Sequence, residues 1–137
     1  MILHHTLVVH GLDHVRAALR PGRPVILLSA PGAAGFAGCL WWRGLIELGR
    51  TEFPGAVLDD VLDCADSPGH CMAALRAGQL RLVLHPACPA FGAVTAAAAT
   101  RGATVLPARP PALDLAAPGA GRKLADWLQR DSAGPLV

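Results

Sequence analysis

Four side chains near the middle of the chain have the chemistry of acid and base catalysis: Asp63, Cys64, Ser67 and His85. A histidine can transfer a proton near neutral pH, a carboxylate can orient it, and a cysteine or serine can act as a nucleophile. The set predicts an enzyme that acts on a phosphorylated or carboxylated substrate, with His85 as the general acid or base. This enzyme hypothesis is one of two that the sequence leaves open.

A turn containing two glycines offers a different chemistry, the binding of an anion. Ser29 ends an apolar segment, and Gly32 and Gly35 follow within residues 30–35. Backbone N–H groups at the start of a helix favour anions, and glycines let a ligand approach closely. Together with Ser67, which begins another helix, Ser29, Gly32 and Gly35 are the predicted ligand-binding residues. The alternative is that the two glycines only allow the helix to pack closely on the strand, because the turn matches a dinucleotide-binding motif incompletely.

Cysteine and histidine side chains could form a third kind of site, for zinc. The side chains that could converge are those of Cys64, His70, Cys71, His85 and Cys88. Because His70 and Cys71 lie one helical turn in, the candidate ligands are Cys64, His85 and Cys88, and the spacing of the last two suits zinc. The chain has no CxxC pair, and cysteine is among the residue types most often buried. We therefore predict neither a metal site nor a cofactor. All four cysteines are expected to be reduced side chains of a core.

Two uncharged runs indicate how these residues are positioned. Residues 24–29 and 80–85 each read as a buried strand, and each is followed by a turn and a helix. Parallel strands buried on both faces have this pattern, because crossover helices join them. The sequence predicts a single three-layer α/β domain with a mainly parallel, open, doubly wound sheet of about five strands, similar to flavodoxin or Rossmann folds. The two runs are its expected central strands.

The remaining elements follow from turn and capping signals. The expected strands are 6–10, 24–29, 56–64, 80–85 and 103–106, and the expected helices are 13–19, 33–49, 68–77, 90–101 and 119–130. Right-handed crossovers would place every turn that follows a strand at one edge of the sheet, where Arg109 would join the candidate residues. The domain is expected to span 1–131, with 132–137 as a frayed tail. An eight-fold barrel is excluded, because it needs about 250 residues and the chain has 137.

The expected helix 33–49 carries more apolar residues than one face can bury. Phe36, Leu40, Leu45 and Leu48 fall near one face, and the adjacent Trp41 and Trp42 cannot both point to it. Only 16% of the residues are charged, against about 25% in ordinary soluble domains. We therefore expect a homodimer or larger homo-oligomer with Trp41 or Trp42 at the interface.

Composition and motifs exclude several functional classes. The net charge is only +2 and the basic residues are scattered, which excludes a nucleic-acid-binding footprint. Prolines interrupt both uncharged runs, so we expect no membrane span, and the first residues lack the features of a signal peptide, which predicts a cytoplasmic protein. The motifs of P-loop proteins, serine hydrolases, zinc proteases and EF-hands are absent.

A helix–strand unit of about twenty residues consists of Ser67-Pro68, then residues 74–78, then residues 82–87. It resembles a unit of the barrel aldolases that act on 2-keto-3-deoxy-6-phosphogluconate. The resemblance implies an α/β architecture. It argues against the aldolase activity, because Val83 stands where that family has its Schiff-base lysine and the single lysine, Lys123, lies in the last expected helix.

The favoured hypothesis is a binding or regulatory module that is homo-oligomeric and recognises an anionic small molecule or a protein partner. The alternative is the small enzyme described above. Catalysis by acids and bases needs several polar groups that converge in a pocket. The chain has only three serines and no tyrosine, which favours binding.

Overall fold

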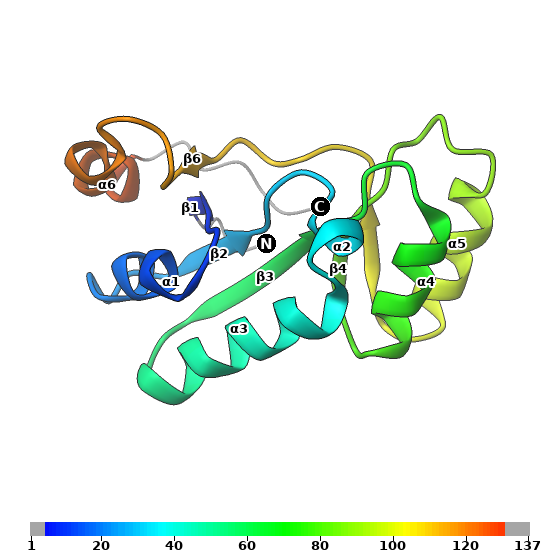
Figure 1. Cartoon of the computed structure of the whole chain (residues 1–137), viewed down its shortest axis with the longest axis horizontal. Helices are drawn as coiled ribbons and strands as arrows, with labels where there is room; N and C mark the ends of the chain where they lie inside the picture. The colour runs from blue at the N-terminus through cyan, green and yellow to red at the C-terminus, as the bar shows by residue number, and fades with distance from the viewer. Residues whose placement is uncertain (1–4, 131–137) are drawn as a thin grey trace.

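A computed structural model describes residues 5–130 and contains one sheet of six parallel strands (Figure 1). The elements in chain order are β1 His5–Val8, α1 Leu12–Leu19, β2 Val25–Leu28, α2 Ala33–Phe36, α3 Cys39–Glu52, β3 Leu58–Asp63, α4 Pro68–Arg76, β4 Arg81–Val83, α5 Phe91–Ala99, β5 Thr104–Leu106, β6 Leu113–Asp114 and α6 Ala120–Gln129. The expected α/β class with a parallel open sheet is confirmed. The predicted tail, 132–137, lies outside the described residues, so its boundary stays a prediction.

The strand order is β5-β4-β3-β2-β1-β6, and all five neighbouring pairs are parallel. β2 lies in the middle of the sheet as expected, whereas β4 lies between β3 and the edge strand β5. The short β6, which the sequence did not predict, is on the far side of β1. The segment that joins β5 to β6 must therefore cross the sheet, and Figure 1 shows it as a long connection without a helix.

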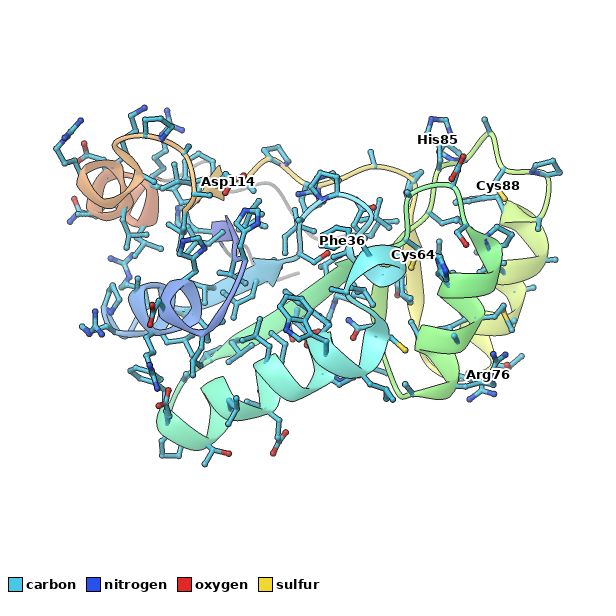
Figure 2. The ribbon with its side chains drawn as sticks, in the orientation of Figure 1. Phe36, Cys64, Arg76, His85, Cys88 and Asp114 are labelled. Atoms are coloured by element: carbon cyan, nitrogen blue, oxygen red, sulfur yellow. The ribbon has the colours of Figure 1, made fainter. Side chains whose placement is uncertain are left out.

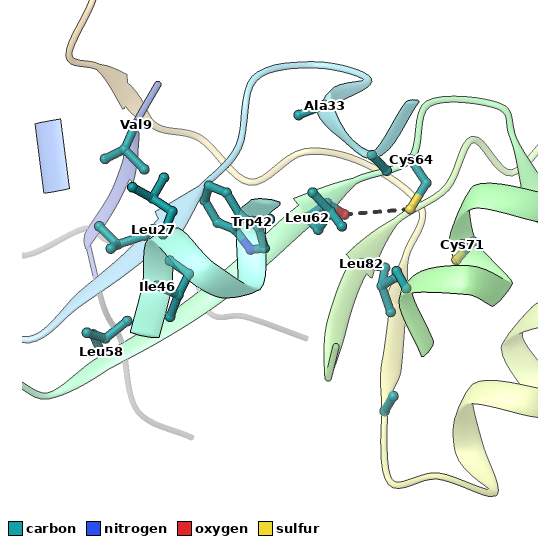
Figure 3. Packing of buried hydrophobic residues seen from close by; sticks show 14 of the residues in the cluster. Val9, Leu27, Ala33, Trp42, Ile46, Leu58, Leu62, Cys64, Cys71 and Leu82 are labelled. Carbon is teal, nitrogen blue, oxygen red and sulfur yellow. Dashed lines mark hydrogen bonds between the residues drawn. The ribbon is translucent and has the colours of Figure 1, made fainter. Parts of the chain in front are cut away.

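Two hydrophobic clusters form because alternate residues of a strand point to opposite faces. In β2, Val25 and Leu27 belong to the larger cluster, and Ile26 and Leu28 to the smaller one. The larger cluster receives buried side chains from all six described helices, and Figure 3 shows part of its interior. The buried members of the smaller cluster come from strands alone, with Ala112 packed against them. No helix among residues 5–130 is long and apolar enough to cross a membrane.

The expected helix 33–49 is two helices, because Gly38 has a φ of 93° between α2 and α3. A residue with a side chain is strained in this region of backbone space, so the helix breaks there. The expected inward face was also wrong, although Leu40, Leu45 and Leu48 all lie in α3. Phe36, Leu40 and Leu48 are exposed, and only Leu45 of the four predicted residues is buried.

The buried side of α3 is centred on Trp42, which is completely buried. Figure 3 shows its ring between side chains of β2 and β3. Trp42 donates its indole N–H to Oδ2 of Asp60 over 2.8 Å, and Arg43 and Gln79 donate to the same oxygen over 3.0 and 2.8 Å. Asp60 is thus a buried residue inside β3, and three donors compensate its charge.

Candidate functional site

A hollow of about 600 Å³ lies at the carboxyl ends of β3, β4 and β5. Its lining residues are Pro31, Asp63, Ala65, Asp66, Val83, His85, Pro107, Ala108 and Arg109. They come from four separate segments, each of which follows a strand or ends it. Parallel α/β sheets commonly bind ligands at this edge, and the volume is in the range of small-molecule sites.

Asp63 organises one wall of the hollow and is only 3% exposed. Its Oδ1 accepts the backbone N–H of Gly32 over 3.0 Å and that of Ala65 over 2.7 Å. Its Oδ2 accepts Nη1 of Arg109 over 2.8 Å. One carboxylate therefore ties together the turn after β2, the end of β3 and the connection after β5.

The glycine turn already binds a carboxylate of the chain itself, that of Asp63. The N–H of Gly32 is bonded to Asp63, and the N–H of Gly35 donates to the carbonyl of Gly32 over 2.9 Å. A side chain at Gly35 would come within 3.0 Å of the ring of His70, so this glycine allows α2 to approach α4 closely. The glycines thus have packing and hydrogen-bonding roles inside the chain.

The other two predicted ligand-binding residues are also engaged within the chain. Ser29 is fully buried, accepts the N–H of Asp63 over 2.9 Å, and donates its hydroxyl to the carbonyl of Ala30 over 3.0 Å. Ser67 caps α4, as expected from the sequence, by accepting the N–H of His70 over 3.3 Å. Neither serine lines the hollow.

Ala65, which lines the hollow, holds a strained conformation. Its φ is 52°, and among the described residues no other residue with a side chain has a positive φ. Two hydrogen bonds hold it, one from its own N–H to Asp63 and one from the N–H of His85 to its carbonyl over 2.8 Å. Strain of this kind concentrates at functional sites, where surrounding contacts enforce it.

Arg109 and His85 line the hollow, and each has nitrogen atoms that form no hydrogen bond with the other described residues. Arg109 uses one nitrogen on Asp63, and among residues 5–130 its other N–H groups have no acceptor. His85 accepts the N–H of Ala87 at Nδ1 over 3.1 Å, so a neutral ring carries its proton on Nε2. The sequence placed Arg109 at this edge but gave no sign of its bond to Asp63, which joins residues 46 positions apart.

The four candidate catalytic residues do not form one group. Asp63 and His85 line the hollow, whereas Cys64 points to the other face of the sheet and is 1% exposed in the larger cluster. Interaction with the thiol of Cys71, together with burial, raises the pKa of Cys64, so the nucleophilic thiolate is disfavoured. Figure 2 shows Cys64 beside α2 and α4, apart from His85. Ser67 is occupied as a helix cap.

The three candidate zinc ligands are divided in the same way. His85 and Cys88 share a second, smaller hollow with Asp66, whereas Cys64 is in the core. Figure 2 shows Cys64 away from His85 and Cys88. In the part of the chain that the structure describes, no cluster of three or more histidine, cysteine or acidic side chains could hold a metal ion.

No known family model matches the chain, and no curated protein matches it at a significant level. The geometry of the site is therefore the ground on which a function can be proposed.

Proposed function

We propose that the protein is a homo-oligomeric binding module whose hollow at the strand ends takes a small anionic molecule. The observation that carries this proposal is the geometry of Arg109. One nitrogen of its guanidinium is anchored on the buried carboxylate of Asp63, and the side chain is 27% exposed at the hollow. An anchored guanidinium presents its remaining N–H groups in a fixed plane, which suits a carboxylate or a phosphate.

His85 supports the proposal as a second donor. Its Nδ1 is occupied by the N–H of Ala87, which orients the ring and leaves Nε2 for a ligand. The residue is exposed and lines the same hollow as Arg109. Two donors from different loops would bind two oxygens of one anionic group or two groups of one ligand.

The carboxylates in the hollow narrow the ligand class. Asp63 is paired with Arg109 and accepts two backbone N–H groups, so its charge is compensated within the chain. Asp66 is exposed at the rim and offers an acceptor. The ligand would therefore carry a hydroxyl or amino group as well as a carboxylate or phosphate.

Binding is favoured over catalysis because the candidate nucleophiles are not at the hollow. Cys64 is buried on the other face, and Ser67 is a helix cap. The enzyme alternative would depend on His85 and Asp66 alone for proton transfer. Self-association, which the low charged fraction favours, and a location in the cytoplasm complete the proposal.

The test is a titration of ¹⁵N-labelled protein with inorganic phosphate and with 3-phosphoglycerate, which carries a phosphate, a carboxylate and a hydroxyl. We expect saturable shifts at the N–H groups of Ala65, Ala87 and Arg109. Ala108→Glu would place a negative charge at the exposed rim of the hollow and should weaken binding at least about tenfold, because a like charge in contact costs about 1.4 kcal/mol or more. Ala96→Glu, on the exposed side of α5, is the matched control and should bind as the wild type does.

Other outcomes would overturn the proposed site. Shifts confined to Gly32 and Gly35 would favour the glycine turn that the sequence predicted. The absence of saturable shifts at millimolar concentrations of either probe would remove the anion-binding proposal. Arg109→Lys preserves the charge that Asp63 needs but loses the planar donors, so binding that is unchanged in this variant would also contradict it.

A further inference from the structure

The outward side of α2 and α3 carries large apolar side chains that the chain itself does not cover. Phe36 is 73% exposed, Leu40 74%, Trp41 39% and Leu48 51%. A hollow of about 710 Å³ runs along α3 beside the start of α1, and Leu40, Trp41 and Leu48 line it. Contiguous apolar surface of this kind marks interaction sites.

Gly44 lies at the centre of this surface. Leu40, Gly44 and Leu48 are spaced four residues apart, so they form one stripe along the helix, opposite the buried side that contains Trp42 and Ile46. A Cβ at Gly44 would meet no atom within 4 Å. Glycine inside a helix costs roughly 0.5–1 kcal/mol relative to alanine, and no contact among the described residues requires it here.

We infer that a second copy of this chain docks on this surface, with α3 against α3 in antiparallel orientation and Gly44 at the two-fold axis. The stripe is symmetric about Gly44, so the axis places Leu40 of each copy level with Leu48 of the other. A two-fold interface requires such self-complementarity. Glycine at the crossing point lets the two helices approach closely. The inference rests on the self-association in the proposed function and is independent of anion binding.

Charge complementarity favours the same arrangement. From the period of an α-helix, Glu47 and Arg43 lie on the same flank of the stripe, about 60° and 100° from Gly44. The antiparallel two-fold axis therefore brings Glu47 of one copy beside Arg43 of the other. Within residues 5–130 Glu47 forms no ion pair, and Arg43 uses only Nη1 for Asp60 and Gln79.

The available area suits a dimer that forms at moderate concentration. The four exposed apolar side chains offer roughly 100 Å² each, judged from their exposed fractions. This is roughly half of the 800 Å² or so that each partner buries in a standard interface. The flanking polar side chains of α3 and the start of α1 would supply the rest.

Light scattering on gel-filtered protein at micromolar concentrations tests the interface. We expect a dimer mass for the wild type and a monomer mass for Leu48→Glu. Leu80→Glu changes a leucine of matching exposure, 53%, outside this surface and should remain dimeric. Circular dichroism and the phosphate titration of each variant report whether it is folded.

A cysteine on the two-fold axis gives a second, independent readout. Gly44→Cys should form a disulfide-linked dimer under mild oxidation that reductant reverses, whereas Leu80→Cys and the wild type should not. A monomeric wild type would overturn both the self-association and this interface. A wild-type dimer that persists in Leu48→Glu, or that does not cross-link through Gly44→Cys, would overturn the interface alone. Neither result would affect the anion-binding site.

Discussion

The indole N–H of Trp42 lies 2.8 Å from Oδ2 of Asp60, and this bond joins α3 to the middle of β3. The bond and the packing around it determine which side of α3 faces the sheet. Leu45, Ile46 and Gly49 are buried on the same side, and Trp41 is turned to the surface. Of the two adjacent tryptophans, the one that forms this buried hydrogen bond is therefore a core residue, and the other is a surface residue.

The first prediction is that Asp60→Ala lowers the free energy of unfolding by about 3 kcal/mol. The change leaves the buried N–H of Trp42 without its acceptor and removes the charged partner of Arg43, which are among the costliest effects of single substitutions. Urea unfolding followed by tryptophan fluorescence measures it. Asp13→Ala is the control, because the side chain of Asp13 is 97% exposed and its pairing contributes less than about 1 kcal/mol. Equal losses in the two variants would contradict the role of the buried bond.

The orientation of α3 could not be predicted from the sequence because its apolar residues nearly surround the helix. Leu40 lies about 140° from Leu45 around the axis of α3, and Gly38 separates Phe36 from this helix. The bond from Trp42 to Asp60 then selects one side through a contact between elements. By contrast, the start of α4 was predictable, because Ser67 and the following proline act locally.

The edge of the sheet that holds the site could be predicted from the sequence. The orientation of Cys64 and the contact between Arg109 and Asp63 could not. Parallel strands bring the residues after β2, β3 and β4 together, which placed Asp63 and His85 at one hollow. Period-two alternation puts the neighbouring Cys64 on the opposite face, a consequence that needed the register of β3. The contact of Arg109 with Asp63 depends on the path of a connection that crosses the whole sheet.

Two glycines of α3 should respond oppositely to alanine. A Cβ at Gly49 would lie 2.7 Å from Cγ1 of Val15 and 3.3 Å from Cδ1 of Leu19, so Gly49→Ala should push α1 away and cost about 1–2 kcal/mol. Gly44→Ala meets nothing and should stabilise the monomer by roughly 0.5–1 kcal/mol. Urea unfolding in dilute solution compares them.

The Gly44→Ala variant also tests the dimer. Because Gly44 is at the proposed two-fold axis, Gly44→Ala should weaken association while it stabilises the monomer. The amount by which its free energy of unfolding exceeds that of the wild type should therefore shrink as the protein concentration rises. An advantage that does not change with concentration would argue against a helix crossing at this residue.

The strain at Ala65 predicts an unusual tolerance of glycine. With a φ of 52°, the alanine side chain destabilises the folded state by roughly 1 kcal/mol, and Ala65→Gly removes this strain. Glycine also makes the unfolded chain more flexible, which destabilises the folded state by about the same amount. We expect stability within about 0.5 kcal/mol of the wild type. Ala96→Gly, inside α5 on its exposed side, should cost about 1 kcal/mol. A loss at Ala65 as large as that at Ala96 would show that the strain is small.

Asp114, at the end of β6, predicts a dependence of stability on pH. Partial burial opposes its charged form, but the N–H of Ala116 and the ring of His10, at 2.9 and 2.8 Å, stabilise it, and the pKa of Asp114 is lowered from its usual 3.8. A carboxyl whose pKa is lower in the folded state adds stability above the unfolded value. It loses that contribution as the pH falls through the folded value.

Asp114→Asn should therefore be less stable than the wild type above about pH 5, by less than about 1 kcal/mol because the side chain is 44% exposed. The difference should shrink as the pH falls below about 4, where the wild-type carboxylate takes up its proton. Urea unfolding of both proteins across this range measures the difference, and Asp126→Asn, on α6 outside this contact, controls for the loss of a charge. A difference that stays constant down to the lowest pH would mean that Asp114 stabilises the end of β6 through its shape and not through its charge.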